Sequence, residues 1–396
     1  MNEKTHSETS DNDNSLPPVK SLRELIDRAT GRTLTSSQVQ EDAGFADVIP
    51  FPFLAMVGQR EMKLALLLAL INPTMGGVLL IGPRGTGKTT IVRSLVDLLP
   101  EVPRSLCFYG CLPEDIENGG MDAVCPDCAK KFAMGEPLAV LDRVRLVELP
   151  LNARLEDVVG GLDERAAIHE RLRLRRGILA HADRNLLYVD EVNLLDDQVV
   201  DAILDAAAQG HYTVRRGPVS ATYRSRFVLI GSMNPEEGNL RPQIMDRFGL
   251  RVVVGGLRDP EDRLEAYRRV HSYLNNPRQT VDQFSIETAS AQNEIQAARD
   301  HVPQVDLPDH VARQGLALVE KLQIVSLRAE ISLFEAARAH AVSDGRMEVS
   351  MDDLRAVAPM SLRLRRSTFI SDYLSNQEKE EQELEDILSE FLTESD

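Results

Sequence analysis

Hydrophobic and polar positions follow two different patterns along the chain. Between residues 49 and 256, short apolar runs of the kind that form buried parallel strands are separated by segments with helical spacing. Three of these runs cover residues 78–81, 186–189 and 227–231, and a Gly, Asp or Asn residue lies at or just after the end of each. Open parallel sheets bind ligands at the carboxyl ends of their strands. The pattern therefore predicts an α/β domain over residues 49–256, with a binding site where these runs end.

The pattern after residue 256 is helical. Amphipathic segments predict a helical linker over residues 257–305, and three further helices predict a small all-α lid domain over residues 306–370. Residues 1–48 are rich in Ser, Asn, Asp and Thr and predict a disordered polar and acidic arm, whereas residues 371–396 predict an acidic tail. The helices are expected at residues 260–272, 286–300, 309–323, 327–343 and 351–360.

The run after the first predicted strand carries a phosphate-binding motif. Residues 82–89, GPRGTGKT, match G-x-x-x-x-G-K-[ST] and lie between an apolar strand and an amphipathic helical pattern, as the motif requires. Its glycines let backbone N–H groups point at phosphate oxygens, Lys88 supplies a cation for the β- and γ-phosphates, and the Thr89 hydroxyl can ligate Mg²⁺. The nucleotide is expected to contact Gly82, Pro83, Arg84, Gly85, Thr86, Gly87, Lys88, Thr89 and Thr90.

Two adjacent carboxylates and an amide follow the next apolar runs. Asp190 is expected to hold the hydrated Mg²⁺, and Glu191 to orient and deprotonate the attacking water. Paired acids can also cap a helix, but their position downstream of a phosphate-binding loop favours the catalytic interpretation. Asn234 ends the following strand, where its neutral amide can hydrogen-bond the γ-phosphate or the water without repelling either. A turn formed by Asn234 and Pro235 is the alternative.

Arginines in two places are candidates for contacts with the γ-phosphate. Arg247 follows a helix start at Pro242, and a guanidinium against a neighbouring subunit's γ-phosphate stabilises transition-state charge. A surface ion pair with Asp246 is the alternative for Arg247, and Arg241 ranks second for the same role. Arg328, at the start of a lid helix, can sense bound ATP and move the lid, or it can have a structural role alone.

All four cysteines fall in one loop, over residues 105–130. Three residues separate Cys107 from Cys111 and two separate Cys125 from Cys128, a set that can form a tetrahedral zinc site. Reduced thiols without metal and a redox-switchable disulfide are the alternatives.

Composition narrows the classes of partner. The chain of 396 residues has a net charge of −17, 5% aromatic residues and no Trp. This charge disfavours non-specific binding to nucleic acid, which needs clustered Lys and Arg. No apolar run approaches the roughly 20 residues that span a bilayer, and the polar N-terminus is unlike a secretory or transit signal. These features predict a cytoplasmic protein that binds neither nucleic acid nor membranes.

Beyond these motifs, longer segments within residues 49–370 resemble one family, the AAA+ subunit I of magnesium chelatase, in the group with MoxR-type ATPases. The most specific are residues 188–197, YVDEVNLLDD, and residues 234–249, NPEEGNLRPQIMDRFG. Other segments are similar to the family's approach to the phosphate-binding loop (residues 49–53, 57–59, 71–73 and 76–81) and to its sensor 2 helix (residues 326–330 and 336–339).

The resemblance implies an AAA+ P-loop NTPase fold, with a parallel sheet of the five-stranded type, β-hairpin insertions and a small all-α lid. It implies a homo-oligomeric, hexameric ring that hydrolyses Mg-ATP between subunits, with Asp246 and Arg247 at the interface and Arg328 as sensor 2. The implied partners are a second AAA+ subunit with an integrin-type domain and a large porphyrin-binding subunit. Together they insert Mg²⁺ into protoporphyrin IX, in (bacterio)chlorophyll synthesis.

Two other functions remain open at this point. Residues 152–163, 214–220 and 223–225 depart from the family's usual sequences, in loops that face the pore or the partners in that family. A MoxR-like chaperone that remodels a partner with an integrin-type domain is the main alternative. A nucleic-acid translocase similar to replicative helicases is the other, and the acidic charge argues against it.

Overall fold

The computed structural model describes residues 49–366, except residues 108, 163–173 and 218. The arm expected at residues 1–48 and the tail expected at residues 371–396 therefore lie outside the described residues. The elements described below belong to the unit that begins at Pro50. Among them, no helix combines the length and apolar character that crossing a membrane requires.

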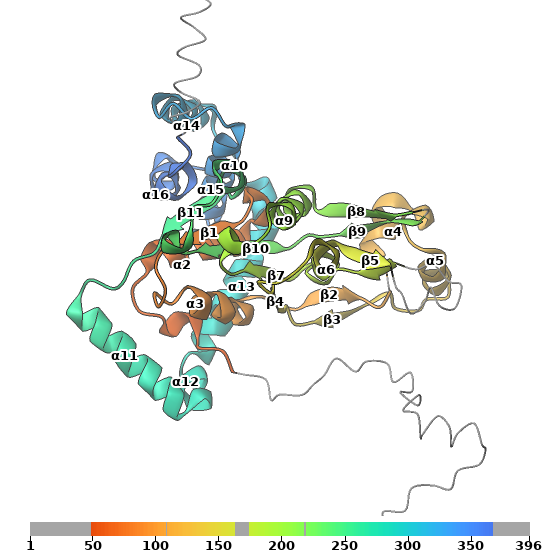
Figure 1. The fold of residues 1–396 in the computed structure, drawn as a ribbon, viewed down its shortest axis with the longest axis horizontal. Coiled ribbons are helices and arrows are strands. Elements are labelled where there is room, and N and C mark those ends of the chain that lie inside the picture. Colours follow the sequence, from red (N-terminus) through yellow and green to blue (C-terminus); the bar gives the residue numbers. More distant parts are fainter. Residues whose placement is uncertain (1–48, 108, 163–173, 218, 367–396) are drawn as a thin grey trace, which may run out of the picture. The chain divides into compact units, whose positions relative to one another are not determined.

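A five-stranded parallel sheet forms the centre of the α/β domain (Figure 1). Numbered along the chain, its strands are arranged in the order 5-1-4-3-2, with the phosphate-loop strand between the fourth and fifth. This arrangement confirms the predicted fold class. The strands are β11 (Leu250–Val253), β1 (Val78–Ile81), β10 (Val228–Met233), β7 (Leu186–Val189) and β4 (Leu146–Glu148).

Helices cover both faces of this sheet, which is why its strands are apolar at successive positions rather than alternate ones. The helices of the α/β domain outside the insertions are α2 (Arg60–Ile71), α3 (Lys88–Ser94), α6 (Leu155–Val159), α8 (Ile178–His181), α9 (Asp197–Gln209) and α10 (Pro242–Arg247). Val78 and Leu80 of β1 pack into one core cluster with α2 and α3, and Leu79 and Ile81 pack into a second cluster with α9 and α10.

Three antiparallel hairpins are inserted between the core elements, as the predicted fold class requires. One pairs β2 (Val102–Ser105) with β3 (Ala139–Asp142), and the chain between them forms α4 (Pro113–Gly119) and α5 (Pro126–Ala133). The second pairs β5 (Gly160–Leu162) with β6 (Leu174–Arg176), and the third pairs β8 (His211–Arg216) with β9 (Val219–Arg224).

The chain after β11 is helical, and its last helices form the lid. The helices are α11 (Pro260–Asn275), α12 (Pro277–Gln283), α13 (Ser285–His301), α14 (Asp309–Lys321), α15 (Leu327–Ser343) and α16 (Met351–Leu362). α13 packs on α2, and α15 packs on both α2 and α13, so the lid shares a core cluster with one face of the sheet. Short 3₁₀ helices occupy Phe53–Ala55, Pro73–Met75, Leu95–Leu98, Met121–Ala123, Val192–Leu194, Pro235–Glu237 and Val302–Gln304.

Candidate functional site

The phosphate-binding loop connects the carboxyl end of β1 to the start of α3. A side chain at Gly82 would place its Cβ 2.1 Å from the carbonyl oxygen of Val254, so close strand packing requires glycine there. Gly85 has a φ of +77° and nothing within 4 Å of the position where a Cβ would lie, so the loop backbone is open to a ligand. The loop borders a cavity of about 270 Å³, whose lining includes the loop backbone, Lys88, Thr89 and Asp190, the groups that a Mg-triphosphate needs.

Lys88 lies at the bottom of this cavity. Its Nζ donates to the carbonyl oxygens of Gly82 at 2.7 Å and Pro83 at 2.8 Å, and the residue is 9% exposed. Burial lowers the pKa of Lys88, and the nearby carboxylates of Asp190 and Glu191 act in the opposite direction. An ammonium held this way can exchange its carbonyl acceptors for phosphate oxygens.

Two hydroxyls hold the carboxylate of Asp190 at the end of β7. The Tyr188 hydroxyl donates to Asp190 Oδ1 at 2.8 Å, and the Ser232 hydroxyl donates to the same oxygen. Burial raises the pKa of Tyr188 well above its usual value, so this phenol keeps the proton that it donates. Thr89 Oγ1 lies 3.5 Å from Asp190 Oδ2, which brings together the two side chains expected to hold Mg²⁺, a cation that prefers oxygen ligands.

Glu191 lies beside this pair in a strained conformation. Its φ is +49°, in the left-handed region that costs a non-glycine residue about 1 kcal/mol, and its N–H donates to Ser232 Oγ at 3.2 Å. An exposed guanidinium on the phosphate-binding loop, that of Arg84, pairs with Glu191 at 3.0 Å and with Glu237 at 2.5 Å. Arg84 therefore links the loop to the carboxylate expected to activate water.

Asn234 completes the wall of the cavity from the end of β10. The residue is 4% exposed, and its side-chain oxygen accepts the N–H of Glu236 at 3.3 Å. That bond fixes the amide, so its NH₂ group remains to meet an oxygen inside the cavity. Chain segments more than a hundred residues apart thus supply the cavity with a cation, two acids and an amide.

A second, mostly apolar pocket of about 370 Å³ adjoins the phosphate-binding loop. It shares Gly85, Thr86, Gly87 and Thr90 with the first cavity, and residues 51–59, residues 256–257 and α11 form its other walls. Arg269 of α11 donates to the Ala55 carbonyl at 3.1 Å and ties these two segments together, and Gln59 Nε2 donates to the carbonyl of Gly255, ahead of α11, at 2.7 Å. The size and lining suit a planar base whose phosphates lie on the loop. Met56, Val57, Leu257, Ala266 and Val270 contribute its apolar lining.

Arg247 and Arg328 do not line either pocket. α10 ends at Arg247, just before β11 begins, and Gly249 N donates to the carbonyl of Gly76, which precedes β1. Arg247 therefore lies near the amino ends of the strands, and so does Arg328, which lies 3.7 Å from Asp246 of α10. The phosphate-binding loop lies at the carboxyl ends. The length of β1, about 13 Å for four residues, separates the two edges.

Acidic side chains partner these arginines within the chain. Arg247 pairs with Asp205 at 2.7 Å and with Asp201 at 3.2 Å, both on α9, and not with its neighbour Asp246. Arg241, the second candidate, pairs with Asp197 on the same helix. The guanidinium of Arg247 is therefore held by acidic side chains of α9 at the surface, and a phosphate group can compete with them for it.

Asp246 instead joins the α/β domain to the lid. Its carboxylate accepts from Arg365 at 2.7 Å and from the Ser326 hydroxyl at 2.7 Å, and lies 3.7 Å from Arg328. Arg365, with a fully buried side chain, also donates to the carbonyl oxygens of Phe248 and Gly249. Arg328 is half-exposed, so a lid arginine faces outward from this junction.

The four cysteines lie together in the insertion between β2 and β3, away from the nucleotide cavity. All are free thiols, and their sulfur atoms lie within 4.8 Å of one another. Burial raises the pKa of Cys111 to about 11. Burial acts upward at Cys107 too, but hydrogen bonds from backbone N–H groups, Tyr109 first, and from neighbouring cysteine side chains outweigh it and bring the pKa of Cys107 to about 7. The insertion therefore concentrates sulfur ligands with unequal proton affinities at one point.

Some residues of the site carried no functional assignment from sequence reasoning. Tyr188 and Ser232 lie inside motifs that the sequence analysis used, but their shared contact with Asp190 exists only once β7 and β10 pair. The apolar pocket joins residues 51–59 to α11, roughly 200 residues further on, and no spacing rule connects those segments.

Comparisons with known proteins identify chains that are similar to this one. A family model described as "Magnesium chelatase, subunit ChlI" matches residues 162–249, and one described as "AAA lid domain" matches residues 317–387. The chain is 42% identical over 345 residues to the "Magnesium-chelatase subunit ChlI homolog" of Methanocaldococcus jannaschii, covering 86% of this chain and 91% of that protein.

Two further similarities support the same grouping and the fold. The chain is 42% identical over 317 residues to the "Magnesium-chelatase 38 kDa subunit" of Acidiphilium rubrum, covering 80% of this chain and 90% of the relative. A solved structure of a protein from Cytophaga hutchinsonii is 20% identical, with a TM-score of 0.52, and covers 79% of this chain and 84% of that one. At that identity the last similarity concerns the fold alone.

Proposed function

This chain belongs to the magnesium chelatase subunit ChlI family, and we propose that it is the ATP-hydrolysing motor that drives insertion of Mg²⁺ into protoporphyrin IX in (bacterio)chlorophyll synthesis. As a member it is an AAA+ ATPase subunit of a chelatase complex. The observation that carries the motor role is the cavity of about 270 Å³, in which Lys88, Asp190 and Glu191 converge.

ATP binds, in this proposal, across both pockets. The triphosphate lies on residues 82–90, where Lys88 exchanges its carbonyl partners for β- and γ-phosphate oxygens. The adenine occupies the apolar pocket between residues 51–59 and α11. Thr89 and Asp190 would hold Mg²⁺, which neutralises phosphate charge when bound, and Tyr188 and Ser232 keep the Asp190 carboxylate in position.

Hydrolysis then uses the two polar groups opposite the loop. Glu191 accepts a proton from a water molecule whose oxygen attacks the γ-phosphorus, and the bond from that phosphorus to the β-phosphate bridging oxygen breaks. ADP leaves with the electron pair of that bond. Asn234 orients the water or a γ-oxygen without adding negative charge, and Lys88 offsets the charge that builds up on the phosphates.

A neighbouring subunit supplies the remaining cations. Arg247 and Arg328 lie near the amino ends of the strands, about the length of β1 from their own phosphate-binding loop. Both reach a γ-phosphate in a head-to-tail ring, where the edge of one subunit that carries the arginines faces the loop of the next. We therefore assign both arginines to the site of the adjacent subunit in a closed homo-oligomer, a hexamer by family resemblance.

The chelatase reaction tests the function as a whole. The purified chain is mixed with the second AAA+ chelatase subunit, which carries an integrin-type domain, and with the large porphyrin-binding subunit from the same organism. Protoporphyrin IX, Mg²⁺ and ATP are added, and the absorbance of Mg-protoporphyrin is followed together with phosphate release. We expect metal insertion that depends on this chain and stops when its Lys88→Ala variant replaces it.

A specific result contradicts the chelatase assignment. If this chain hydrolyses ATP but no Mg-protoporphyrin forms, while the same partners are active with a known subunit I, its substrate lies elsewhere. Remodelling of another partner with an integrin-type domain, the MoxR-like alternative, then explains the ATPase.

A further inference from the structure

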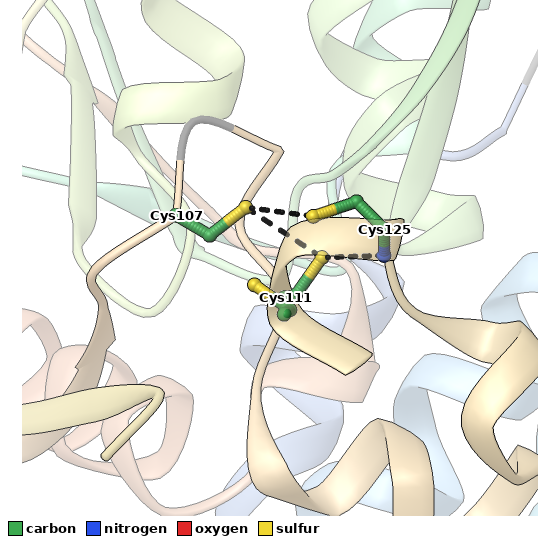
Figure 2. A group of neighbouring side chains, drawn as sticks. Cys107, Cys111 and Cys125 are labelled. Carbon is green, nitrogen blue, oxygen red and sulfur yellow. Dashed lines mark hydrogen bonds between the residues drawn. The ribbon is translucent and has the colours of Figure 1, made fainter. Parts of the chain in front are cut away.

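The insertion between β2 and β3 gathers every cysteine of the chain into one group, and Figure 2 labels three of them. We call Cys107, Cys111, Cys125 and Cys128 the four-cysteine cluster. Cys107 follows β2 after one residue, Cys125 caps the N-terminus of α5, and Cys128 lies in its first turn. Two of the four, Cys111 and Cys128, are buried, so the sulfur atoms face the inside of the insertion.

The distances between sulfur atoms match a tetrahedral metal site. Cys107 Sγ lies 3.5 Å from Cys125 Sγ and 3.7 Å from Cys111 Sγ, and all four sulfur atoms lie within 4.8 Å of one another. Zinc–sulfur bonds of about 2.3 Å in a tetrahedron set the sulfur atoms about 3.8 Å apart. A disulfide needs sulfur atoms about 2.05 Å apart, so the cluster has the spacing of shared ligands rather than of a bridge.

Two backbone N–H groups donate to sulfur atoms of the cluster. The N–H of Tyr109 donates to Cys107 Sγ at 3.2 Å, and the N–H of Cys125 donates to Cys111 Sγ at 3.4 Å. Amide hydrogen bonds of this kind stabilise negative sulfur, which is the form that binds a metal. Arg224 lines a surface pocket together with Cys111 and Cys125, but its guanidinium pairs with Asp115.

The insertion has little else to hold it together. Its core cluster contains three buried residues, Cys111, Cys128 and Leu138, packed against a few partly buried neighbours. So small a core cannot offset the entropy of ordering more than 30 residues, and short segments of this kind are usually stabilised by metals or disulfides. Ion pairs contact the rest of the α/β domain: Asp115 pairs with Arg224 of β9, and Glu114 pairs with Arg184 at 2.7 Å, but partly exposed pairs of this kind add little stability.

A second group of possible ligands, His340, Asp344 and Asp353, has a different explanation. Arg346 already pairs with Asp344 at 2.9 Å and with Asp353 at 2.5 Å, so a cation of the chain itself fills that site. Among the described residues, no comparable cation of the chain pairs with the sulfur atoms of the four-cysteine cluster.

We propose that the four-cysteine cluster binds one Zn²⁺ ion, which folds the insertion between β2 and β3 and so lets it dock on the β8–β9 hairpin. The metal joins the segment that follows β2, which carries Cys107 and Cys111, to the start of α5, which carries Cys125 and Cys128. α4 lies between these two cysteine pairs in the sequence. Asp115 of α4 then meets Arg224. The site is independent of the nucleotide cavity, since none of its cysteines lines that cavity.

Metal analysis of the full chain is the direct test. The protein is purified without metal-affinity chromatography, and zinc is measured by mass spectrometry of the elements. We expect about one zinc ion per chain, and we expect Co²⁺ substitution to give the visible d–d bands and near-ultraviolet charge-transfer bands of tetrahedral thiolate coordination. Zinc below about 0.1 per chain with four titratable thiols, or an intact mass lower by two hydrogens per disulfide, overturns the proposal.

Variants locate the metal and separate it from the ATPase. Cys128→Ser should lower the zinc content at least about tenfold, whereas Asp344→Asn, in the second group of possible ligands, should leave it unchanged. If Cys128→Ser does not fold, chelation of the wild-type protein replaces it. Removing zinc should speed tryptic cleavage at Lys130 and Lys131 of α5 and leave ATP binding intact. Unchanged zinc in Cys128→Ser, or unchanged cleavage after zinc loss, contradicts the proposal.

Discussion

At the scale of single residues, the phosphate-binding loop holds its lysine where phosphate has to bind. Lys88 Nζ donates to two carbonyl oxygens of its own loop, and burial lowers the pKa of its ammonium. Phosphate oxygens carry full charge, so they form stronger hydrogen bonds to the ammonium than carbonyl oxygens do. Nucleotide binding therefore involves an exchange of partners by Lys88 that favours the phosphates.

Removing this ammonium tests the exchange. We expect Lys88→Ala to weaken ATP binding by about a hundredfold, because charge-assisted hydrogen bonds to two phosphates are lost. Titration with a fluorescent ATP analogue measures the dissociation constant. Arg93→Ala is the matched control, since Arg93 lies on the same helix but its guanidinium pairs with Glu148 at 2.7 Å on the surface. Undiminished affinity in Lys88→Ala contradicts the phosphate-loop assignment.

Two glutamates, Glu191 and Glu237, pair with Arg84, so a variant of Glu237 can serve as the control for the catalytic role of Glu191. We expect Glu191→Gln to bind ATP with near wild-type affinity and to hydrolyse it at least about a hundredfold more slowly, because an amide cannot accept the proton of the attacking water. Glu237→Gln removes the other ion pair of Arg84 and should keep most of the turnover. Single-turnover phosphate release compares the two, and similar rates would remove Glu191 from its role.

Sequence motifs locate Lys88 and the catalytic carboxylates because binding a triphosphate requires these residue types at these spacings. The glycine-rich loop with Lys88, and a carboxylate at the end of a later strand, are requirements of the ligand, so their spacing is recognisable without a structure. The partners of Asp190 are different. Tyr188 and Ser232 are ordinary residues in their strands, and only the pairing of β7 with β10 brings both hydroxyls to one carboxylate oxygen.

At the scale of elements, the lid depends on a buried carboxylate at the start of α16. Asp353 is fully buried, accepts from Arg346 at 2.5 Å and from the Ser350 N–H at 2.8 Å, and lies 2.6 Å from the His340 ring. Burial alone raises the pKa of Asp353, but these partners outweigh it and hold the pKa well below its usual range. The carboxylate therefore joins α15 to α16 and caps α16 at the same time.

This carboxylate makes lid stability depend on acid. Its pKa in the folded chain lies below the unfolded value of about 4, so its contribution is present above about pH 4 and is lost as pH falls through the folded pKa. We expect Asp353→Asn to lower the free energy of unfolding by about 3 kcal/mol at pH 7 and to flatten the acid dependence, as measured by urea unfolding between pH 3 and pH 7. Asp352→Asn is the control, because Asp352 is exposed. Equal effects in both variants contradict the buried network.

Helices are the part of the fold that the sequence pattern predicts well, since apolar residues at helical spacing mark the face that packs. The helices expected at residues 327–343 and 351–360 correspond to α15 and α16 within two residues. The short α12 was not expected, because its seven residues hold too few apolar positions to show a period. The base-sized pocket also escaped prediction, since it forms where α11 meets residues 51–59.

At the scale of the whole molecule, the two halves of the proposed catalytic site lie at opposite edges of one sheet. Lys88 and Glu191 line the cavity at the carboxyl ends of the strands. Arg247 lies near the amino ends, held by Asp201 and Asp205 of α9. No rotation of the Arg247 side chain spans the length of β1, so a single subunit cannot complete the site. Repeating this polarity around a closed ring completes a site at each interface.

Mixing two inactive variants tests that polarity. Arg247→Ala and Glu191→Gln should each bind ATP and hydrolyse almost none alone. Mixed before assembly in equal amounts, they should recover about a quarter of wild-type turnover. An interface is active only when an Arg247→Ala subunit supplies the intact Glu191 and a Glu191→Gln subunit supplies the intact Arg247, and random assembly places this pair at about a quarter of the interfaces. A mixture of Glu191→Gln with the double variant is the control, since no interface in it contains an intact glutamate. If Arg247 instead acted on its own subunit's nucleotide, both mixtures would stay inactive at every ratio.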